Sequence, residues 1–438
     1  MKPVYNKTTR LAEISGISPF EIVKRYANKP GTIWLDSTLT FGDRGKMSFI
    51  GLNPVARISQ MGNGIAIKSQ RNDLTILNSG NIFDIVENCV TTSNLTAVGY
   101  ISYEAMYPGL ELTPKVKPEI PEISFYFYDD ILRYSHVTDS FENENLIADF
   151  VDVPSGIYDP KFETRPRLVD AQPKAYYIKN VKKIQEHIKE GDIYQANYTT
   201  RFNVVSQEDP FSVYRNLRDL NPAPYGAYLN YGDFHILSSS PERMFKKDNN
   251  KISSSPIKGT IELGQTEDEQ KRNLQTLVES AKDKAELLMI VDLIRNDLGR
   301  ISKKGSVHVD AIYKPEIYSS LIHLVSDISS ELEADVTFPD IAQSLFPGGS
   351  ITGTPKRRAV EILSELEHLP RSVYTGCIGY IDKDSADFNI AIRTMYHKKS
   401  HYYIHAGGGI IADSDPESEY HEMMLKAKNL LRAVGIDD

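Results

Sequence analysis

Segments typical of strands and segments typical of helices are grouped in blocks along this chain and do not alternate one by one. Short β-branched and aromatic runs separated by polar turns predominate in the first third, as in Met47–Ile50 and Ile123–Tyr128. Helical spacing of apolar residues is clearer later, as in Tyr177, Val181 and Ile188. Because a doubly wound parallel sheet requires regular alternation, the blocks favour an α+β fold with mostly antiparallel strands.

The same patterns, together with capping residues, predict the individual elements. Gly191 follows one helical pattern as its C-terminal glycine, and Pro416 suits the first position of the last helix. We predict strands at Gly31–Leu35, Met47–Ile50, Ala97–Tyr103, Ile123–Tyr128 and Ile193–Val205. We predict helices at Pro19–Ala27, Ile82–Asn88, Tyr177–Ile188, one long helix from about Glu267 to Asp297, and one from Asp415 through Ala433.

One segment is typical of a boundary between domains. Asp152–Lys174 contains four prolines and little hydrophobic periodicity. A chain of 438 residues is long enough for about two to three domain-sized units, or for one large body. We therefore divide the chain into an N-terminal region, 1–165, and a C-terminal region, 166–438.

Composition disfavours several classes of protein. Lys and Arg number 50 against 59 Asp and Glu, which gives a net charge of −9, whereas nucleic-acid binding depends on basic patches. Cys89 and Cys377 are far apart and form no CxxC pair, which disfavours a disulfide framework and a zinc site. The start has no signal-peptide pattern, and no run of about 18 apolar residues occurs. We expect a soluble cytoplasmic protein without a nucleic-acid or membrane partner.

Two pairs of carboxylates form the most informative cluster. Asp283 and Glu286 are spaced i, i+3 on one predicted helix, Glu419 and Glu422 repeat this spacing on another, and Lys426 follows one turn later. Two helices that face each other with such pairs could hold Mg²⁺ and leave positions open for water and a substrate carboxylate. For any one such pair, a solvated helix face is the more common explanation, and the glycine-rich segment just before Glu419 and Glu422 weakens that alternative.

Two glycine-rich segments precede predicted helices. Ala406–Gly409 (AGGG) and Phe346–Lys356 (FPGGSITGTPK) read as turns whose backbone N–H groups could bind carboxylates or phosphates. Neither has the glycine spacing of a Walker A loop or of GxGxxG. As isolated motifs, both segments are therefore first interpreted as ordinary tight turns.

Three single residues are candidates for chemistry. Lys258, in SSSPIKGT, would have to lose its proton to act as a nucleophile, and a surface charge is the usual role of a lysine. Glu242, in SSSPERMF, is the matching acid or base. For His323, in SSLIHLVSD, spacing alone favours a hydrogen-bonded core histidine.

Taken together, these segments belong to a longer series of motifs between about residues 175 and 430. In chain order the series is GDIYQANYTTRF, SSSPERMF, SPIKGT, AKDKAELLMIVDLIRNDLGR, LIHLVSD, FPGGSITGTPKRRA, YTGCIGY, IRTMY and HAGGGIIADSDPESEYHE. This series resembles the chorismate-utilising enzymes, which include component I of anthranilate synthase and of aminodeoxychorismate synthase. The resemblance implies large antiparallel sheets packed as a sandwich with helices outside. It also implies a cleft in the second half of the chain as the active site.

One residue distinguishes two branches of this family. Anthranilate synthases usually have alanine in PIAGT, whereas bacterial aminodeoxychorismate synthases usually have PIKGT, as this chain does at Lys258. The resemblance therefore implies Mg²⁺-dependent amination of chorismate by ammonia to 4-amino-4-deoxychorismate, in the p-aminobenzoate branch of folate synthesis. The alternative is anthranilate synthase component I, of tryptophan synthesis.

The resemblance also implies roles for individual residues. Lys258 would attack chorismate C2 and Glu242 would protonate the departing C4 hydroxyl. Glu286, Glu419 and Glu422 would hold Mg²⁺, with Asp283 acting through water. The implied substrate-binding residues are Gly259, Thr260, His323, Ser350, Thr352, Tyr374, Arg393, Gly407, Gly408, Gly409 and Lys426.

The chain shows no reactive-cysteine motif of the kind that a glutamine amidotransferase needs. We therefore expect ammonia from a separate glutamine amidotransferase subunit, and a further enzyme for conversion to p-aminobenzoate. Relatives carry a tryptophan-sized pocket in the N-terminal region, and Asp36 and Ser37 of WLDS match that region.

Two other activities fit the motifs less well. An isochorismate or salicylate synthase is disfavoured because the SPERMF and PIKGT segments follow the ammonia-using branch. A non-catalytic protein that binds an aromatic metabolite would be free to lose the carboxylates, Lys258 and Glu242, all of which are present. Mg²⁺-dependent consumption of chorismate would distinguish an enzyme from such a binding protein.

Overall fold

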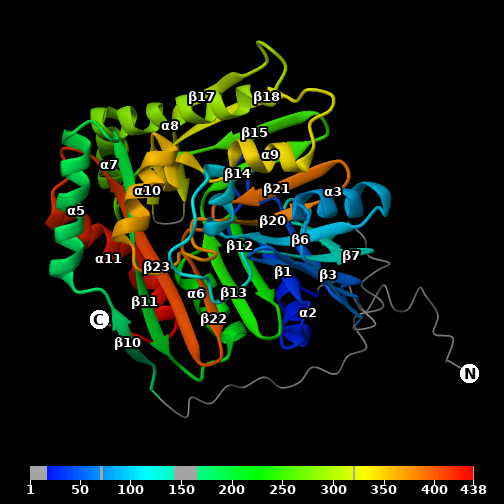
Figure 1. The fold of residues 1–438 in the computed structure, drawn as a ribbon. Helices are drawn as coiled ribbons and strands as arrows, with labels where there is room; N and C mark the ends of the chain where they lie inside the picture. Colours follow the sequence, from blue (N-terminus) through cyan, green and yellow to red (C-terminus); the bar gives the residue numbers. More distant parts are fainter. Residues whose placement is uncertain (1–16, 70–72, 143–164, 319–320, 438) are drawn as a thin grey trace, which may run out of the picture.

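The chain folds into two large antiparallel sheets that face each other, with helices on their outer sides (Figure 1). The structure is a computed structural model, and it describes residues 17–69, 73–142, 165–318 and 321–437. Residues 152–164 of the predicted boundary segment lie outside this description. The α+β sandwich expected from the sequence is confirmed.

The first sheet has 11 strands among the described residues. In spatial order they are β10 (Arg167–Ala171), β11 (Gln195–Val205), β23 (His401–Ile410), β22 (Thr394–Lys398), β13 (Phe234–Ser240), β12 (Tyr225–Asn230), β1 (Ile33–Asp36), β2 (Met47–Gly51), β8 (Leu132–Ser135) and β9 (Ser140–Phe141), with β19 (Gly353–Thr354) beside β11.

The second sheet has 12 strands in the same part of the chain. In spatial order they are β16 (Ile257–Glu262), β18 (Leu321–Glu331), β15 (Lys251–Ser255), β14 (Arg243–Asp248), β21 (Ser385–Asn389), β20 (Cys377–Ile381), β6 (Thr96–Ile101), β7 (Ile123–Tyr128), β3 (Ala56–Met61), β4 (Gly64–Ser69) and β5 (Leu74–Leu77), with β17 (His308–Tyr318) beside β18.

Helices cover the outer faces of both sheets (Figure 1). On the first sheet these are α2 (Pro19–Tyr26), α5 (Lys174–Lys189), α6 (Pro210–Leu220), α10 (Lys356–Leu366) and α11 (Pro416–Ala433). On the second they are α3 (Ile82–Thr92), α7 (Glu267–Glu279), α8 (Ala281–Gly299) and α9 (Phe338–Leu345). The short 3₁₀ helices are η1 (Tyr103–Met106), η2 (Pro108–Leu110) and η3 (Gly349–Ile351).

A separate apolar core lies between the two sheets. Ile33 and Leu229 of the first sheet pack there with Val98 and Ile378 of the second. The alternation of side chains along each strand points one set inward to this core and the other set outward to the helices. Each fully buried side chain of this kind stabilises the fold by roughly 1.5–3 kcal/mol.

Strands from before and after the predicted division share both sheets. In the first sheet, β1 pairs with β12, with Ile33 opposite Leu229. In the second sheet, β6 pairs with β20, with Ile101 opposite Cys377. The early strands therefore complete the two sheets that carry the site described below.

The predicted long helix from Glu267 to Asp297 is wrong, because the structure has two helices, α7 and α8, that meet at Ser280. Ser280 has extended backbone angles, and its side chain accepts a hydrogen bond from the Asp283 N–H. A serine in this position begins a new helix because it satisfies a donor that the first turn leaves unpaired. The other predicted helices and strands are confirmed, with ends that differ by a few residues.

The prediction that the glycine-rich segment Ala406–Gly409 forms a turn is also wrong. This segment is the end of strand β23. Three glycines suit a strand here because a neighbouring backbone comes very close. A Cβ on Gly407 would lie 2.2 Å from the Tyr198 carbonyl oxygen of β11. The close approach of β11 therefore requires glycine at this position.

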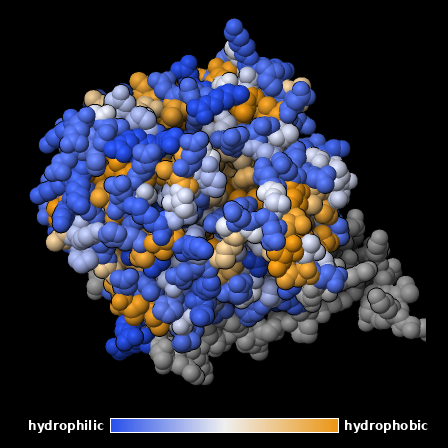
Figure 2. All heavy atoms as spheres, in the orientation of Figure 1, coloured by the Kyte–Doolittle hydropathy of each residue, from blue (hydrophilic) through white to orange (hydrophobic). Residues whose placement is uncertain are grey.

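On the face of the molecule shown in Figure 2, hydrophilic residues predominate and apolar residues form separate patches between them. Within the described residues, no helix has both the length and the apolar character needed to cross a membrane.

Candidate active site at α8, α11, β16 and β23

Carboxylates of α11 lie beside the glycine-rich end of β23. Ser414 donates a hydrogen bond of 2.7 Å to Glu419 Oε1 and so orients this buried carboxylate. Glu422 pairs with Lys426 at 2.8 Å, and the Lys426 ammonium also donates to the Gly407 carbonyl at 3.2 Å. A Cβ on Gly408 would lie 3.3 Å from Glu419 Oε2. The predicted residues of these two elements therefore meet.

Lys258 extends from β16 toward the same place. Its Nζ lies 3.9 Å from Glu286 Oε2 of α8 and would lie 3.6 Å from a Cβ on Gly409. The side chain is mostly buried, with 17% of its surface exposed. The structure therefore brings the predicted nucleophile, one predicted metal ligand and the glycine-rich strand together.

A bulge in β16 sets the direction of Lys258. Lys258 pairs with Leu324 and Thr260 with His323, so Gly259 is the extra residue, with φ of +67°. A Cβ on Gly259 would lie 3.0 Å from Cβ and Cγ of Asp283. Glycine is required there both by its backbone conformation and by the close packing of α8.

The electrostatics of the α11 carboxylates favour a cation between them. Burial, together with repulsion from Glu422, raises the pKa of Glu419, whereas the Lys426 ammonium lowers the pKa of Glu422. A divalent cation would relieve the repulsion between the two glutamates, and carboxylate oxygens are the ligands that Mg²⁺ prefers. The donor set of Glu286, Glu419 and Glu422 therefore fits Mg²⁺ by its chemistry.

The carboxylates face ammonium groups in this structure and are not gathered around one point. In the described residues, the single group of three metal-ligating side chains whose ligand atoms lie within 4.8 Å of one another is His187, Glu190 and Asp192. That group is remote from the predicted ligands in sequence, and Asp192 already pairs with Arg358 at 2.9 Å.

Glu242 lies buried next to the Ser350 segment. Its Oε1 accepts hydrogen bonds of 3.4 Å from the Ser350 hydroxyl and the Ile257 N–H. Burial raises the pKa of Glu242 to about 7, although Lys258 and the two donors lower it in part. A carboxyl group with such a pKa can hold a proton near neutral pH and release it to a leaving group.

Thr260 and His323 form a hydrogen-bonded pair across β16 and β18. Thr260 Oγ1 lies 2.9 Å from His323 Nδ1. Burial and the nearby Arg393 lower the pKa of His323 to about 3, so the imidazole is neutral. Arg393 is half-buried, and its guanidinium donates to Asn221 at 3.0 Å.

Two further predicted substrate residues, Thr352 and Tyr374, lie beside β11 and β23. Thr352 donates its hydroxyl to the Gly348 carbonyl at 3.0 Å, and its own carbonyl accepts from the Asn197 N–H of β11 at 2.8 Å. The Tyr374 ring stacks on His405 of β23, with 5.4 Å between centroids. No measured contact links Tyr374 directly to Lys258 in the described residues.

Two residues at this site escaped the sequence analysis. Gln195 begins β11, and its amide nitrogen would lie 2.6 Å from a Cβ on Gly409. Lys282 of α8 lies 3.9 Å from Glu286. Gln195 occurs in the motif GDIYQANYTTRF, but only the pairing of β11 with β23 shows that it reaches the glycines.

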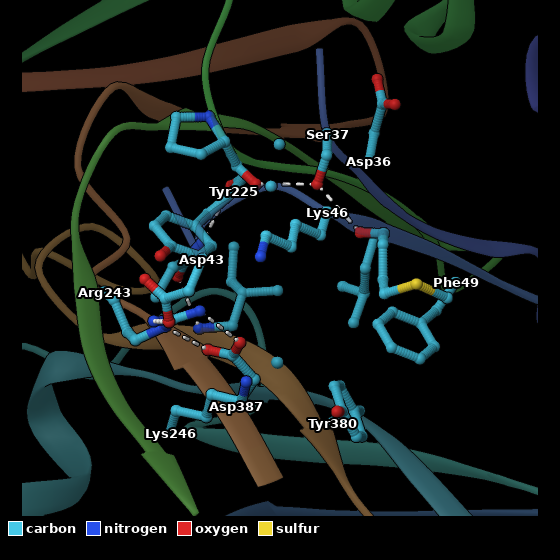
Figure 3. Close-up of a pocket in the computed structure, with 18 of the residues that line it drawn as sticks. Asp36, Ser37, Asp43, Lys46, Phe49, Tyr225, Arg243, Lys246, Tyr380 and Asp387 are labelled. Atoms are coloured by element: carbon cyan, nitrogen blue, oxygen red, sulfur yellow. Dashed lines mark hydrogen bonds and ion pairs between the residues drawn. The ribbon is translucent and has the colours of Figure 1, made fainter. Parts of the chain in front are cut away.

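A separate cavity of about 380 Å³ lies between the two sheets and is lined by both predicted N-terminal pocket residues, Asp36 and Ser37 (Figure 3). Asp36 is buried and pairs with Arg218 at 2.6 Å. Arg243, on the opposite wall, pairs with Asp43 and Asp387, each at 3.0 Å. The cavity is therefore lined by two buried charges, Asp36 and Arg243, that are already paired.

The fold agrees with the comparison to known families. The chain belongs to the chorismate binding enzyme family, whose model matches residues 32–432.

Relatives in two branches of the family are similar along most of the chain. Anthranilate synthase component 1 of Acetivibrio thermocellus is 33% identical over 95% of this chain and 92% of its own. Aminodeoxychorismate synthase component 1 of Bacillus subtilis (strain 168) is 34% identical over 78% of this chain and 77% of its own. The crystal structure of anthranilate synthase component I from Streptococcus pneumoniae TIGR4 superposes with a TM-score of 0.78 at 26% identity, covering 89% of this chain and 93% of that one.

Proposed function

We propose that this chain catalyses the Mg²⁺-dependent amination of chorismate by ammonia to 4-amino-4-deoxychorismate. The observation that carries the proposal is the position of Lys258, which extends from the bulged strand β16 to within 3.9 Å of Glu286. An alanine at this position has no side-chain group that could form a bond with the substrate ring. A lysine there supplies a nucleophile among the residues that would bind chorismate.

The residues of the chain would divide the reaction into two displacements. Once its ammonium has released a proton to solvent, Lys258 would form a bond from Nζ to C2 of chorismate. The ring double bonds would shift, and the C4 hydroxyl would leave as water with the proton of Glu242. Ammonia would then form a bond to C4, and the bond between C2 and Lys258 would break. Glu242 suits the first proton transfer because burial raises its pKa to about 7.

Glu286, Glu419 and Glu422 would hold Mg²⁺, with Asp283 acting through water. When bound, the ion would offset the negative charge of the substrate's ring carboxylate. Arg393 and Tyr374 would bind the enolpyruvyl carboxylate. The backbone of Gly407–Gly409 is suited to help, because β22 pairs with β23 only at residues 401–404 and leaves the glycines paired with β11 alone among the described strands.

Ammonia would come from a separate glutamine amidotransferase subunit. The two relatives compared by sequence above are each named component 1 of a synthase, a name that implies a second component.

Anthranilate synthesis is the second candidate. Several of the similar proteins are named anthranilate synthase component 1, with identities of 31–33% over at least 95% of this chain. Both candidates use the same fold and the same carboxylates, and they differ in the carbon that receives ammonia.

The test is to identify the products from purified protein, chorismate, Mg²⁺ and ammonium, with and without an aminodeoxychorismate lyase. p-Aminobenzoate that appears only with the lyase would support the proposal. Fluorescent anthranilate formed without the lyase would reject it in favour of the second candidate. An unchanged chorismate concentration would reject both activities.

A further inference from the structure

Arg371 is the most completely bonded buried cation near the site. Its side chain is 1% exposed, and all five of its N–H donor positions have acceptors. Nε and Nη2 bind the two oxygens of Glu367 at 2.8 and 2.7 Å. The guanidinium lies 4.2 Å from the centre of the Tyr103 ring.

The other three bonds of this guanidinium go to three separate segments of the chain. Nη1 donates to the Ile351 carbonyl at 3.0 Å and to the Thr375 hydroxyl at 3.2 Å. Nη2 donates to the Asn197 carbonyl at 2.6 Å. The planar geometry of arginine fixes the directions of these bonds, so it also fixes the three segments relative to one another.

Each of the three acceptors is next to a predicted site residue. Ile351 lies between Ser350 and Thr352, and Ser350 donates to the carboxylate of Glu242. Asn197 is paired with Gly409 in the sheet. Thr375 follows Tyr374 directly.

The N-terminal region holds the backbone of the same residue. Glu104 Oε1 accepts hydrogen bonds from the N–H groups of Arg371 at 2.7 Å and Ser372 at 3.3 Å. The Tyr103 N–H donates to the Ser372 carbonyl at 2.9 Å. The backbone of Arg371 is thus held by η1, and its side chain is held by Glu367. Its remaining donors bind the three segments that contain Ile351, Thr375 and Asn197.

We infer that Arg371 is a positioning residue, which holds the Ser350, Asn197 and Thr375 segments in the arrangement that binds chorismate. The inference rests on the proposed use of chorismate at this site, and it is the same for either amination product. Lysine in its place would keep the charge but could not bond three segments and Glu367 at once. A misplacement of about 1 Å in a binding group can cost about a hundredfold in rate.

The test compares three variants by steady-state chorismate consumption with ammonium and Mg²⁺, and by thermal unfolding. Arg371→Lys removes most of the directed bonds, and Thr375→Val removes one of them without removing the buried charge. Arg57→Lys is the matched control, because Arg57 also bonds to a serine hydroxyl and a carbonyl and stacks on Tyr231 at 4.7 Å, but contacts none of the three segments.

We expect KM for chorismate to rise about tenfold or more in Arg371→Lys, and less in Thr375→Val, while Arg57→Lys keeps the wild-type KM. A buried arginine with only a structural role would lower the unfolding temperature and the active fraction but leave KM unchanged. Wild-type KM in both the Arg371→Lys and Thr375→Val variants, or in Thr375→Val with Arg371→Lys unfolded, would therefore overturn the inference. If the unaltered chain did not consume chorismate, the proposed function and this inference would both be wrong.

Discussion

The ammonium nitrogen of Lys258 lies 3.9 Å from a carboxylate oxygen of Glu286, so the candidate nucleophile and a candidate metal ligand are immediate neighbours. They come from different elements, β16 and α8, and the bulge at Gly259 brings them together. A change at Lys258 therefore acts inside the proposed metal and substrate site.

Lys258→Ala is expected to abolish formation of 4-amino-4-deoxychorismate, because no side chain would then add to C2 and expel the C4 hydroxyl. Direct attack of ammonia at C2 would then give anthranilate, which is measured by its fluorescence and by chromatography. Lys251→Ala, an exposed lysine at the start of β15, is the control and should keep the wild-type product. Unchanged turnover to 4-amino-4-deoxychorismate in Lys258→Ala would contradict a covalent role for the lysine.

Glu242→Gln is expected to lower kcat by roughly 10²–10⁴-fold, the usual contribution of a general acid. Since burial raises the pKa of Glu242 to about 7, the protonated form predominates below pH 7 and is lost above it. The wild-type rate should therefore fall as pH rises through 7, and the residual rate of Glu242→Gln should lack this fall. A variant with the wild-type pH profile would assign the transition to another group.

Removal of Mg²⁺ with a chelator is expected to stop chorismate consumption, and excess Mg²⁺ should restore it. Glu286→Gln should weaken the response to Mg²⁺ and lower the rate by about a hundredfold or more, because a ligand to the ion is lost. Glu365→Gln, an exposed glutamate of α10, serves as the control. Full activity of the chelated enzyme would show that these carboxylates do not act through a metal.

Gly409→Ala is expected to fold but to bind chorismate weakly. The new Cβ would meet the flexible end of Gln195 at 2.6 Å, which can move, and would stand 3.6 Å from Lys258 Nζ, where it would narrow the site. KM should rise while the unfolding temperature stays near that of the wild type. Gly109→Ala is the control, since a Cβ there would have no atom within 4 Å apart from its own chain neighbours.

Stability should fall as pH rises through 7, in part because of Glu104. Burial raises the pKa of Glu104 from 4.5 to about 7. The folded state keeps the proton between these values while the unfolded state loses it, so the stabilisation is complete below pH 4.5 and is lost through pH 7. The difference between the pKa of Glu104 in the unfolded and in the folded state corresponds to about 3 kcal/mol in the free energy of unfolding.

Denaturant titrations at several pH values measure this effect. Glu104→Gln should have a smaller decrease of the free energy of unfolding between pH 4.5 and 7 than the wild type. Glu111→Gln, an exposed glutamate of the same region, should retain the wild-type decrease. Equal slopes in all three proteins would mean that Glu104 does not hold a proton in the folded state.

Local sequence patterns predicted most elements but not their contacts. The spacing of Asp283 and Glu286, and of Glu419 and Glu422, correctly placed each pair on a helix. Spacing within one helix carries no information about which helix lies opposite, so the meeting of α11 with β23 required the sheet order.

Two failures of prediction have local causes. The periodicity from Glu267 to Asp297 continues across Ser280, but the side chain of this serine caps a second helix. The glycines of Ala406–Gly409 resemble a turn in sequence, but they lie in a strand. Their lack of a side chain allows the backbone of β11 to approach closely. Arg371 gave no signal, because its role depends on acceptors in distant segments.

The pairing of Ile33 with Leu229 and of Ile101 with Cys377 has a consequence for folding during translation. Neither sheet can be completed until most of the chain has been synthesised, because β1 and β6 pair with strands that are synthesised much later. Folding should accordingly be slow. Until their partners are synthesised, the unpaired edges of β1 and β6 would be able to pair with other nascent chains. A cell that makes this protein would have to shield those strands during translation.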